Sequence, residues 1–226
     1  MDAIESLSVV RGAIRATAVP ERSAPSRPAQ RAAPQVITIS RQAGIEAGAV
    51  GQATAVLLGT PWQSYDRQLI DCVAREHHLS PAVVTSRDEH DESLVEHAMH
   101  GLGSTVPTEV IPVKIAQTIR RLADEGHAII VGRGGQFVLA GRGSARHVRL
   151  IATEAWRVEA FAAATGVSCA EARKTVRRID VDRTRYIKAH FNHNPGDPLA
   201  YDLVLNMEHL DVRQASRAIA ALLPTA

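Results

Sequence analysis

The fold of this chain is decided by the stretch VITISRQAG at residues 36–44. Its beginning, Val36–Ser40, is a short run rich in β-branched side chains, which predicts a buried strand. Glycines follow, and residues 53–58 then have a helical pattern that ends at Gly59. This order predicts a unit made of a strand, a glycine-containing turn and a helix.

Other short apolar runs along the chain predict further strands, at residues 61–65, 128–131, 147–152 and 203–206. Helices are predicted at residues 67–77, from 80, at 107–124, 154–164, 168–179 and 182–190, and from 211. The helix at 168–179 starts with a predicted capping box, Ser168 with Glu171 three residues later. Continuous apolar strands that alternate with helices are typical of a parallel sheet covered on both faces. We therefore expect an α/β fold with a parallel five-stranded sheet and helices on both faces.

The first 35 residues differ in composition from the rest of the chain. Residues 1–35 are rich in Ala, Pro, Ser and Arg, which predicts a disordered leader in front of one domain at residues 36–226. A targeting signal is the alternative, although the prolines and early acidic residues depart from that pattern. No apolar run approaches the roughly 18 residues of a membrane helix, so we expect a cytoplasmic protein without membrane contact.

Charge and composition exclude several classes of partner and site. Residues 36–226 carry equal numbers of basic and acidic side chains, whereas a general nucleic-acid binder needs a basic face. With only two cysteines, a disulfide scaffold and a four-cysteine zinc site are excluded. The histidines at 90, 97 and 100 lack the spacing of a metal site, and a solvated polar segment is the simpler interpretation. With these classes excluded, we expect the ligand to be a small molecule.

Ligands of parallel α/β sheets bind at the carboxyl ends of the strands, and the first loop there spans residues 40–48. Its place between strand and helix is that of a phosphate-binding loop, which makes Ser40, Arg41, Gly44 and Gly48 candidate phosphate ligands. The lysine and the Ser or Thr of the phosphate-loop consensus are absent, and Glu46 would repel an anion. An ordinary glycine turn is the alternative.

A second glycine-rich loop, residues 132–135, follows the run at 128–131. Its Arg133 has a planar guanidinium that can bind a phosphate through two parallel hydrogen bonds, and the flanking glycines leave room for a ligand. The alternative is a tight turn with a solvated arginine. The arginine-rich stretch at residues 173–185 is likewise either a solvated helix face or an arm that closes over phosphates.

Taken together, these segments resemble the cytidylate kinase-like family of P-loop kinases. Six segments are similar in order and spacing, and they stand at residues 37–42, 64–70, 129–134, 152–157, 180–186 and 201–206. Cytidylate kinases transfer the γ-phosphoryl group of ATP to CMP or dCMP with magnesium. The resemblance thus implies a P-loop kinase-like fold, ATP with Mg²⁺ as cofactor and a small nucleotide as partner.

The resemblance also implies roles for particular residues. Arg133 matches the arginine that binds the CMP phosphate, and Asp66 and Arg67 lie where the monophosphate-binding region begins. The implied catalytic residues come from the lid and the segment after it, and they are Arg157, Asp180 and Arg183.

Two positions depart from the family pattern. Residues 44–47 read Gly-Ile-Glu-Ala where members of this branch commonly have Gly-Ser-Gly-Gly, and Gly134 replaces an aspartate of cytidylate kinases. The leading hypothesis is phosphoryl transfer from ATP to a nucleoside monophosphate such as CMP. One alternative is a catalytically inactive kinase fold that binds a nucleotide or a partner and regulates. The other is a kinase of a sugar or another small metabolite.

Overall fold

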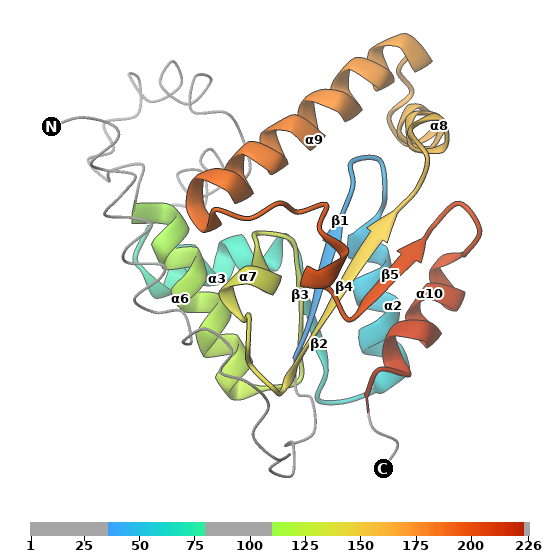
Figure 1. Ribbon diagram of the computed structural model, residues 1–226. Helices are drawn as coiled ribbons and strands as arrows, with labels where there is room; N and C mark the ends of the chain where they lie inside the picture. The colour runs from blue at the N-terminus through green and yellow to red at the C-terminus, as the bar shows by residue number, and fades with distance from the viewer. Residues whose placement is uncertain (1–35, 80–109, 224–226) are drawn as a thin grey trace, which may run out of the picture.

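The computed structural model describes residues 36–79 and 110–223, and one parallel sheet forms its centre (Figure 1). The spatial order of the strands is β2-β3-β1-β4-β5. Their bounds are β1 (Val36–Arg41), β2 (Gln63–Tyr65), β3 (Ala128–Val131), β4 (Ala145–Ile151) and β5 (Leu203–Asn206). All neighbouring strands pair in parallel, which confirms the predicted five-stranded parallel sheet. The expected leader and the helix predicted from residue 80 lie outside the described residues.

Helices cover both faces of the sheet, as the apolar strands predict. On one face lie α2 (Ala47–Leu58) and α10 (Val212–Ala220), which pack on Ile37 and Ile39 of β1. The other face carries α3 (Gln68–Glu76), α6 (Val110–Glu125) and the short α7 (Gly135–Val138). Because successive side chains of a strand point to opposite faces, β1 joins the two halves of the core.

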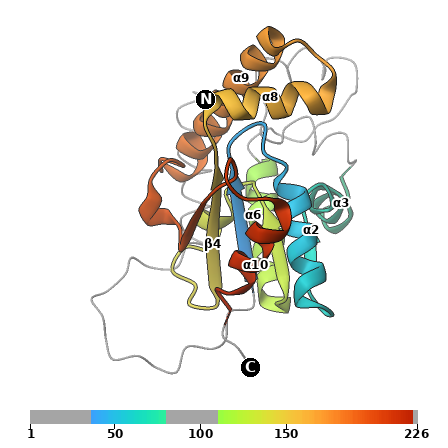
Figure 2. The ribbon, with the colours of Figure 1, turned by 90° about the vertical axis from the view of Figure 1, so that its right-hand side faces the viewer.

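Two helices, α8 (Glu154–Thr165) and α9 (Cys169–Phe191), lie beyond the carboxyl ends of the strands (Figures 1 and 2). The predicted capping box at Ser168 and Glu171 is present at the start of α9. The predicted break of this segment near residue 180 is wrong, because α9 is continuous. Asp180 lies within this helix, and its carboxylate accepts hydrogen bonds from Ala43 and Arg157.

The sequence also misplaced the start of α2, which begins at Ala47 rather than near residue 53. Glycines at 48 and 51 weaken the helical pattern, but packing requires them. A Cβ atom at Gly48 would lie 2.6 Å from the Asp66 carboxylate, and one at Gly51 would lie 2.7 Å from Ser64 Oγ. The helix therefore approaches β2 and the loop after it through these two gaps in its side-chain surface.

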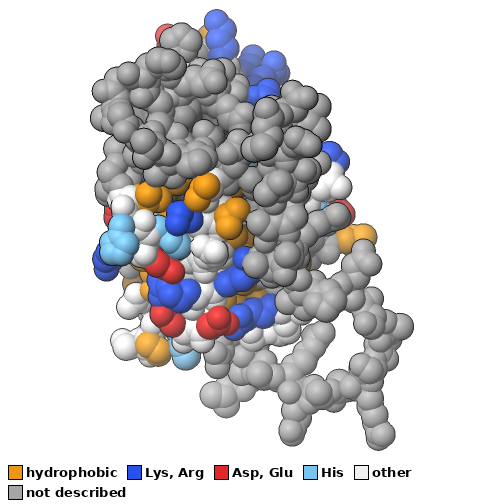
Figure 3. Space-filling model, turned by 90° about the vertical axis from the view of Figure 1, so that its left-hand side faces the viewer, with side chains coloured by type: hydrophobic (Ala, Val, Ile, Leu, Met, Phe, Trp, Pro, Cys, Tyr) orange, Lys and Arg blue, Asp and Glu red, His pale blue; other side chains and the backbone are white. Residues whose placement is uncertain are grey.

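The surface formed by α3 and α6 carries charges of both signs (Figure 3). Arg121 of α6 pairs with Glu76 and Glu125, and Arg142 pairs with Asp124. Such exposed pairs contribute little to stability, but they leave no large field of one sign on the described residues of this face. Across residues 36–79 and 110–223, no helix is both long and apolar enough to cross a membrane.

Candidate functional site

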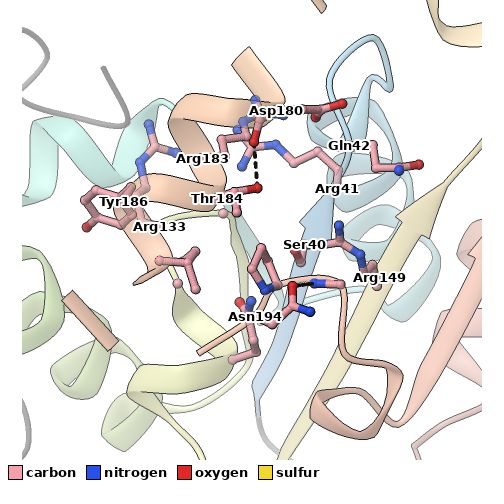
Figure 4. Close-up of a pocket in the computed structure, with 16 residues that line it drawn as sticks. Ser40, Arg41, Gln42, Arg133, Arg149, Asp180, Arg183, Thr184, Tyr186 and Asn194 are labelled. Atoms are coloured by element: carbon pink, nitrogen blue, oxygen red, sulfur yellow. Dashed lines mark hydrogen bonds between the residues drawn. The ribbon is translucent and has the colours of Figure 1, made fainter. Parts of the chain in front are cut away.

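A cavity of about 190 Å³ lies where the carboxyl ends of β1, β3 and β4 meet α9. Four arginines and one aspartate are among its lining residues, so we call it the arginine cavity. Figure 4 shows Ser40 and Arg149 at the strand ends, with Asp180 and Arg183 on α9 across from them. The four arginines are Arg41, Arg133, Arg149 and Arg183. The cavity lies at the sheet edge where ligands of parallel α/β folds bind.

Arg149 forms the floor of the arginine cavity because the register of β1 and β4 places it directly beside Ser40. Its Nη1 donates to Ser40 Oγ at 2.9 Å and to the Tyr201 hydroxyl at 3.3 Å. The Tyr201 ring lies under the guanidinium at 5.5 Å, and its hydroxyl donates to the Pro195 carbonyl at 2.8 Å. This network fixes the planar donor group at the bottom of the cavity.

The loop after β3 holds Arg133 in a buried position. Residues 132, 133 and 134 all have positive φ angles, of 80°, 52° and 68°, which is costly for the one that is not glycine. Hydrogen bonds offset this cost. Arg133 Nη1 donates to Asp66 Oδ1 at 3.2 Å and to the carbonyls of Asp66 and Val131. Arg133 therefore connects the loops after β2 and β3 while it lines the cavity.

The loop after β1 is held by side chains from both α8 and α9. Asp180 Oδ1 accepts the Ala43 N–H at 2.8 Å, and its other oxygen accepts from Arg157 Nη1 at 2.6 Å. The same nitrogen donates to the Ala43 carbonyl at 3.0 Å. We call this arrangement of Ala43, Arg157 and Asp180 the latch. The Asp180 carboxylate thus accepts from the Ala43 N–H, a backbone donor that in a phosphate-binding loop would bind phosphate.

A second cavity, of about 550 Å³, lies on the other side of the same loop, and we call it the apolar cavity. It is bounded by residues 43–46, α8, the end of β5 and the start of α10. Aromatic and aliphatic side chains dominate its lining, among them Trp156, Phe161, Met207 and Leu210. Its size falls within the roughly 300–1,000 Å³ of small-molecule pockets. Arg183 lines both cavities and therefore stands between them.

The structure distributes the ten predicted site residues over this region unevenly. Five of them line the arginine cavity, and these are Ser40, Arg41, Arg133, Asp180 and Arg183. Gly44 lines the apolar cavity, and Gly48 and Asp66 lie against each other at the start of α2. Arg157 is buried in the latch. Arg67 is exposed at the start of α3 and is in the lining of neither cavity.

Arg149 was missed because it stands inside a predicted strand rather than in a loop. A signal was present, since an arginine that interrupts an apolar strand near its carboxyl end points to a polar site at that edge of the sheet. Tyr201, which holds Arg149, is equally hidden, because it is fifty-two residues away along the chain.

The described residues do not fit a magnesium site at the first loop. The helix α2 begins with Ala47 and Gly48, at the place where a Ser or Thr would ligate the ion. Neither residue has a side-chain oxygen. The nearby carboxylates of Asp66 and Asp180 are paired with Arg133 and Arg157. Over the described ranges, no group of three His, Cys, Asp or Glu side chains comes together as metal ligands.

The strand order, the glycine loop before α2 and the arginine cavity at the strand ends belong to an α/β protein with a kinase-like fold. Residues 36–209 match the cytidylate kinase-like family, and the chain belongs to this family.

An uncharacterized protein from Eubacterium ventriosum ATCC 27560 is similar with a TM-score of 0.62 at 19% identity, over 84% of this chain and 97% of that one. Shikimate kinase from Bacteroides thetaiotaomicron has a TM-score of 0.48 at 14% identity, over 83% and 95% of the two chains. At such identity the likeness to the first protein concerns the fold alone. No curated protein matches the sequence.

Proposed function

We propose that this chain transfers a phosphoryl group from a nucleotide donor such as ATP to a phosphorylated acceptor. The observation that carries the proposal is the position of Arg183, which lines the apolar cavity and the arginine cavity at once. The apolar cavity suits a nucleotide base, and the arginine cavity suits the acceptor phosphate. A guanidinium between two such sites stabilises the charge that develops on the transferring group.

In this reaction the bond from the γ-phosphorus of ATP to its β–γ bridging oxygen breaks. A bond to an oxygen of the acceptor phosphate forms, and ADP leaves. Because a phosphate oxygen is already ionised at neutral pH, the chain needs no general base. This agrees with the position of Asp180, whose two carboxylate oxygens accept hydrogen bonds from Ala43 and Arg157. The first loop lacks the lysine of the phosphate-loop consensus, and the arginines neutralise the phosphate charge in its place.

A second candidate function is a catalytically inactive kinase fold that binds a nucleotide and regulates. The first loop favours it, because Glu46 lines the apolar cavity and the latch occupies the Ala43 N–H. Both features oppose a triphosphate at this loop. On this hypothesis ligand binding is retained while turnover is absent.

Calorimetric titration with ATP and with a phosphorylated acceptor, CMP or glycerol phosphate, tests the proposal, with and without magnesium, and is followed by a transfer assay to each acceptor. Arg183→Gln is expected to lower kcat by about a thousandfold, because removal of an arginine that stabilises the transferring phosphoryl group has effects of that size. The matched control is Arg178→Gln, an exposed arginine on the same helix outside both cavity linings. Binding without transfer selects the inactive candidate. Failure of both ligands to bind overturns the proposal.

A further inference from the structure

One wall of the arginine cavity is closed by packed apolar side chains. A Cβ atom added to Gly134 would overlap the Phe191 ring. It would lie only 2.8 Å from Phe191 Cζ and 3.2 Å from Ile187 Cδ1. Phe191 in turn lies beside Phe137, with ring centroids 5.8 Å apart, and Phe137 stacks on His193 at 4.8 Å. The glycine is thus required by packing, because the Ile187 and Phe191 side chains occupy the space beside it.

The remaining lining of the arginine cavity is strongly positive. Its four arginines face a single aspartate, so the charged lining residues have an excess of three positive charges. The aspartate is itself paired with Arg157 of the latch. At about 190 Å³ the cavity is smaller than the roughly 300–1,000 Å³ of pockets that bury drug-sized ligands. High positive charge in a small volume selects a compact anion.

The floor of the cavity adds a specific donor group. Among the described residues, both hydrogen bonds of Arg149 use Nη1 alone. Its Nε and Nη2 therefore keep their donor capacity beside Ser40, at the end of β1. Two parallel N–H donors on a fixed plane match two oxygens of a phosphoryl group.

We infer that the arginine cavity binds the phosphoryl dianion of a compact phosphomonoester, with Arg149 as its floor, and that it excludes nucleoside monophosphates. This inference deepens the proposed function by naming the acceptor class. It implies a kinase of a small phosphorylated metabolite rather than of CMP. The ligand oxygens lie against Arg149, and the small volume of the cavity limits the size of the attached group, with Gly134 and Ile187 in its lining and Phe191 packed behind Gly134.

The test uses the full chain without ATP, so that it does not depend on turnover. Orthophosphate, glycerol phosphate and CMP are titrated by calorimetry, each at constant ionic strength. We expect orthophosphate and glycerol phosphate to bind with one site, and CMP to bind more weakly than either. Arg149→Gln is expected to weaken phosphate binding by about tenfold or more, whereas Arg217→Gln, an exposed site on α10, leaves it unchanged.

A second variant tests the closed wall directly. Phe191→Leu keeps an apolar side chain but removes the ring above Gly134, so it should strengthen CMP binding while glycerol phosphate binding stays the same. CMP binding tighter than glycerol phosphate in the unchanged chain overturns the inference. Phosphate binding that is unaffected by Arg149→Gln also overturns it. If glycerol phosphate binds but no transfer from ATP occurs, the proposed function fails and this inference stands.

Discussion

The loops after β1 and β3 both carry glycines at the ligand edge of the sheet, yet they are held in opposite ways. Residues 42–46 after β1 are fixed from outside, by Asp180 and Arg157 of the two helices above them. Residues 132–134 after β3 are fixed from within, by their own positive φ angles and by Arg133. The first loop is therefore hydrogen-bonded to α8 and α9, whereas the second meets α9 only where Gly134 packs against Ile187 and Phe191.

This difference indicates which loop can respond to a ligand. The latch bonds join a loop to helices that lie beyond the sheet, so a phosphate that competes for the Ala43 N–H would release α9 from the loop. In the loop after β3, by contrast, Arg133 is buried and pairs with Asp66 of the loop after β2. We therefore expect a bound phosphate to perturb the first loop more than the second.

The largest expected effect is on the loop after β3. Gly134→Ala should lower the free energy of unfolding by about 3 kcal/mol, because it adds the cost of a left-handed alanine to a clash with the Phe191 ring. Gly166→Ala is the matched control. Its φ of 75° is similar, but no atom lies within 4 Å of the added Cβ, so about 1 kcal/mol is expected. The free energy of unfolding of both variants is measured by urea unfolding. Equal losses for the two would show that the Phe191 ring moves aside at little cost.

A smaller effect is expected at the latch. Asp180→Asn should lower the free energy of unfolding by about 2 kcal/mol, because buried Arg157 loses its charged partner. Amide hydrogen exchange at Ala43 should accelerate, while exchange in residues 132–135 should not. Glu154→Gln, which breaks the exposed pair with Arg177 between the same helices, serves as the control. Its loss should be smaller and should vanish at high salt. If exchange rises equally in both loops, they are not held independently.

The smallest effect concerns the sheet beneath both loops. Burial lowers the pKa of His147 from its usual 6.5, although Asp202 acts in the opposite direction. Below about pH 6.5 the unfolded chain binds a proton that the folded chain does not bind, so stability should fall as the pH drops from 7 toward 5. His147→Gln should reduce this slope in a series of urea titrations. The control His209→Gln, at an exposed position, should retain the slope, and an unchanged slope for both variants would contradict the assignment.

The sequence by itself determined the sheet and most of its helices. Runs such as residues 36–40 and 128–131 are β-branched and apolar, and glycines separate them from amphipathic segments. Strand and helix formation depend on such local patterns, so their order along the chain was enough to predict a parallel sheet covered on both faces. The cap of α9 at Ser168 was predicted for the same reason, since its partner Glu171 is only three residues away.

Only the tertiary structure decided what each arginine does. Arg133, Arg149 and Arg157 look alike in the sequence, yet one joins two loops, one forms the floor of a cavity and one is buried in the latch. Their partners lie far along the chain, as for Ala43 and Asp180, which are 137 residues apart. A guanidinium is bound by whichever carboxylate or carbonyl the folded chain brings to it. That choice depends on how the helices pack over the sheet, which no local pattern of residues records.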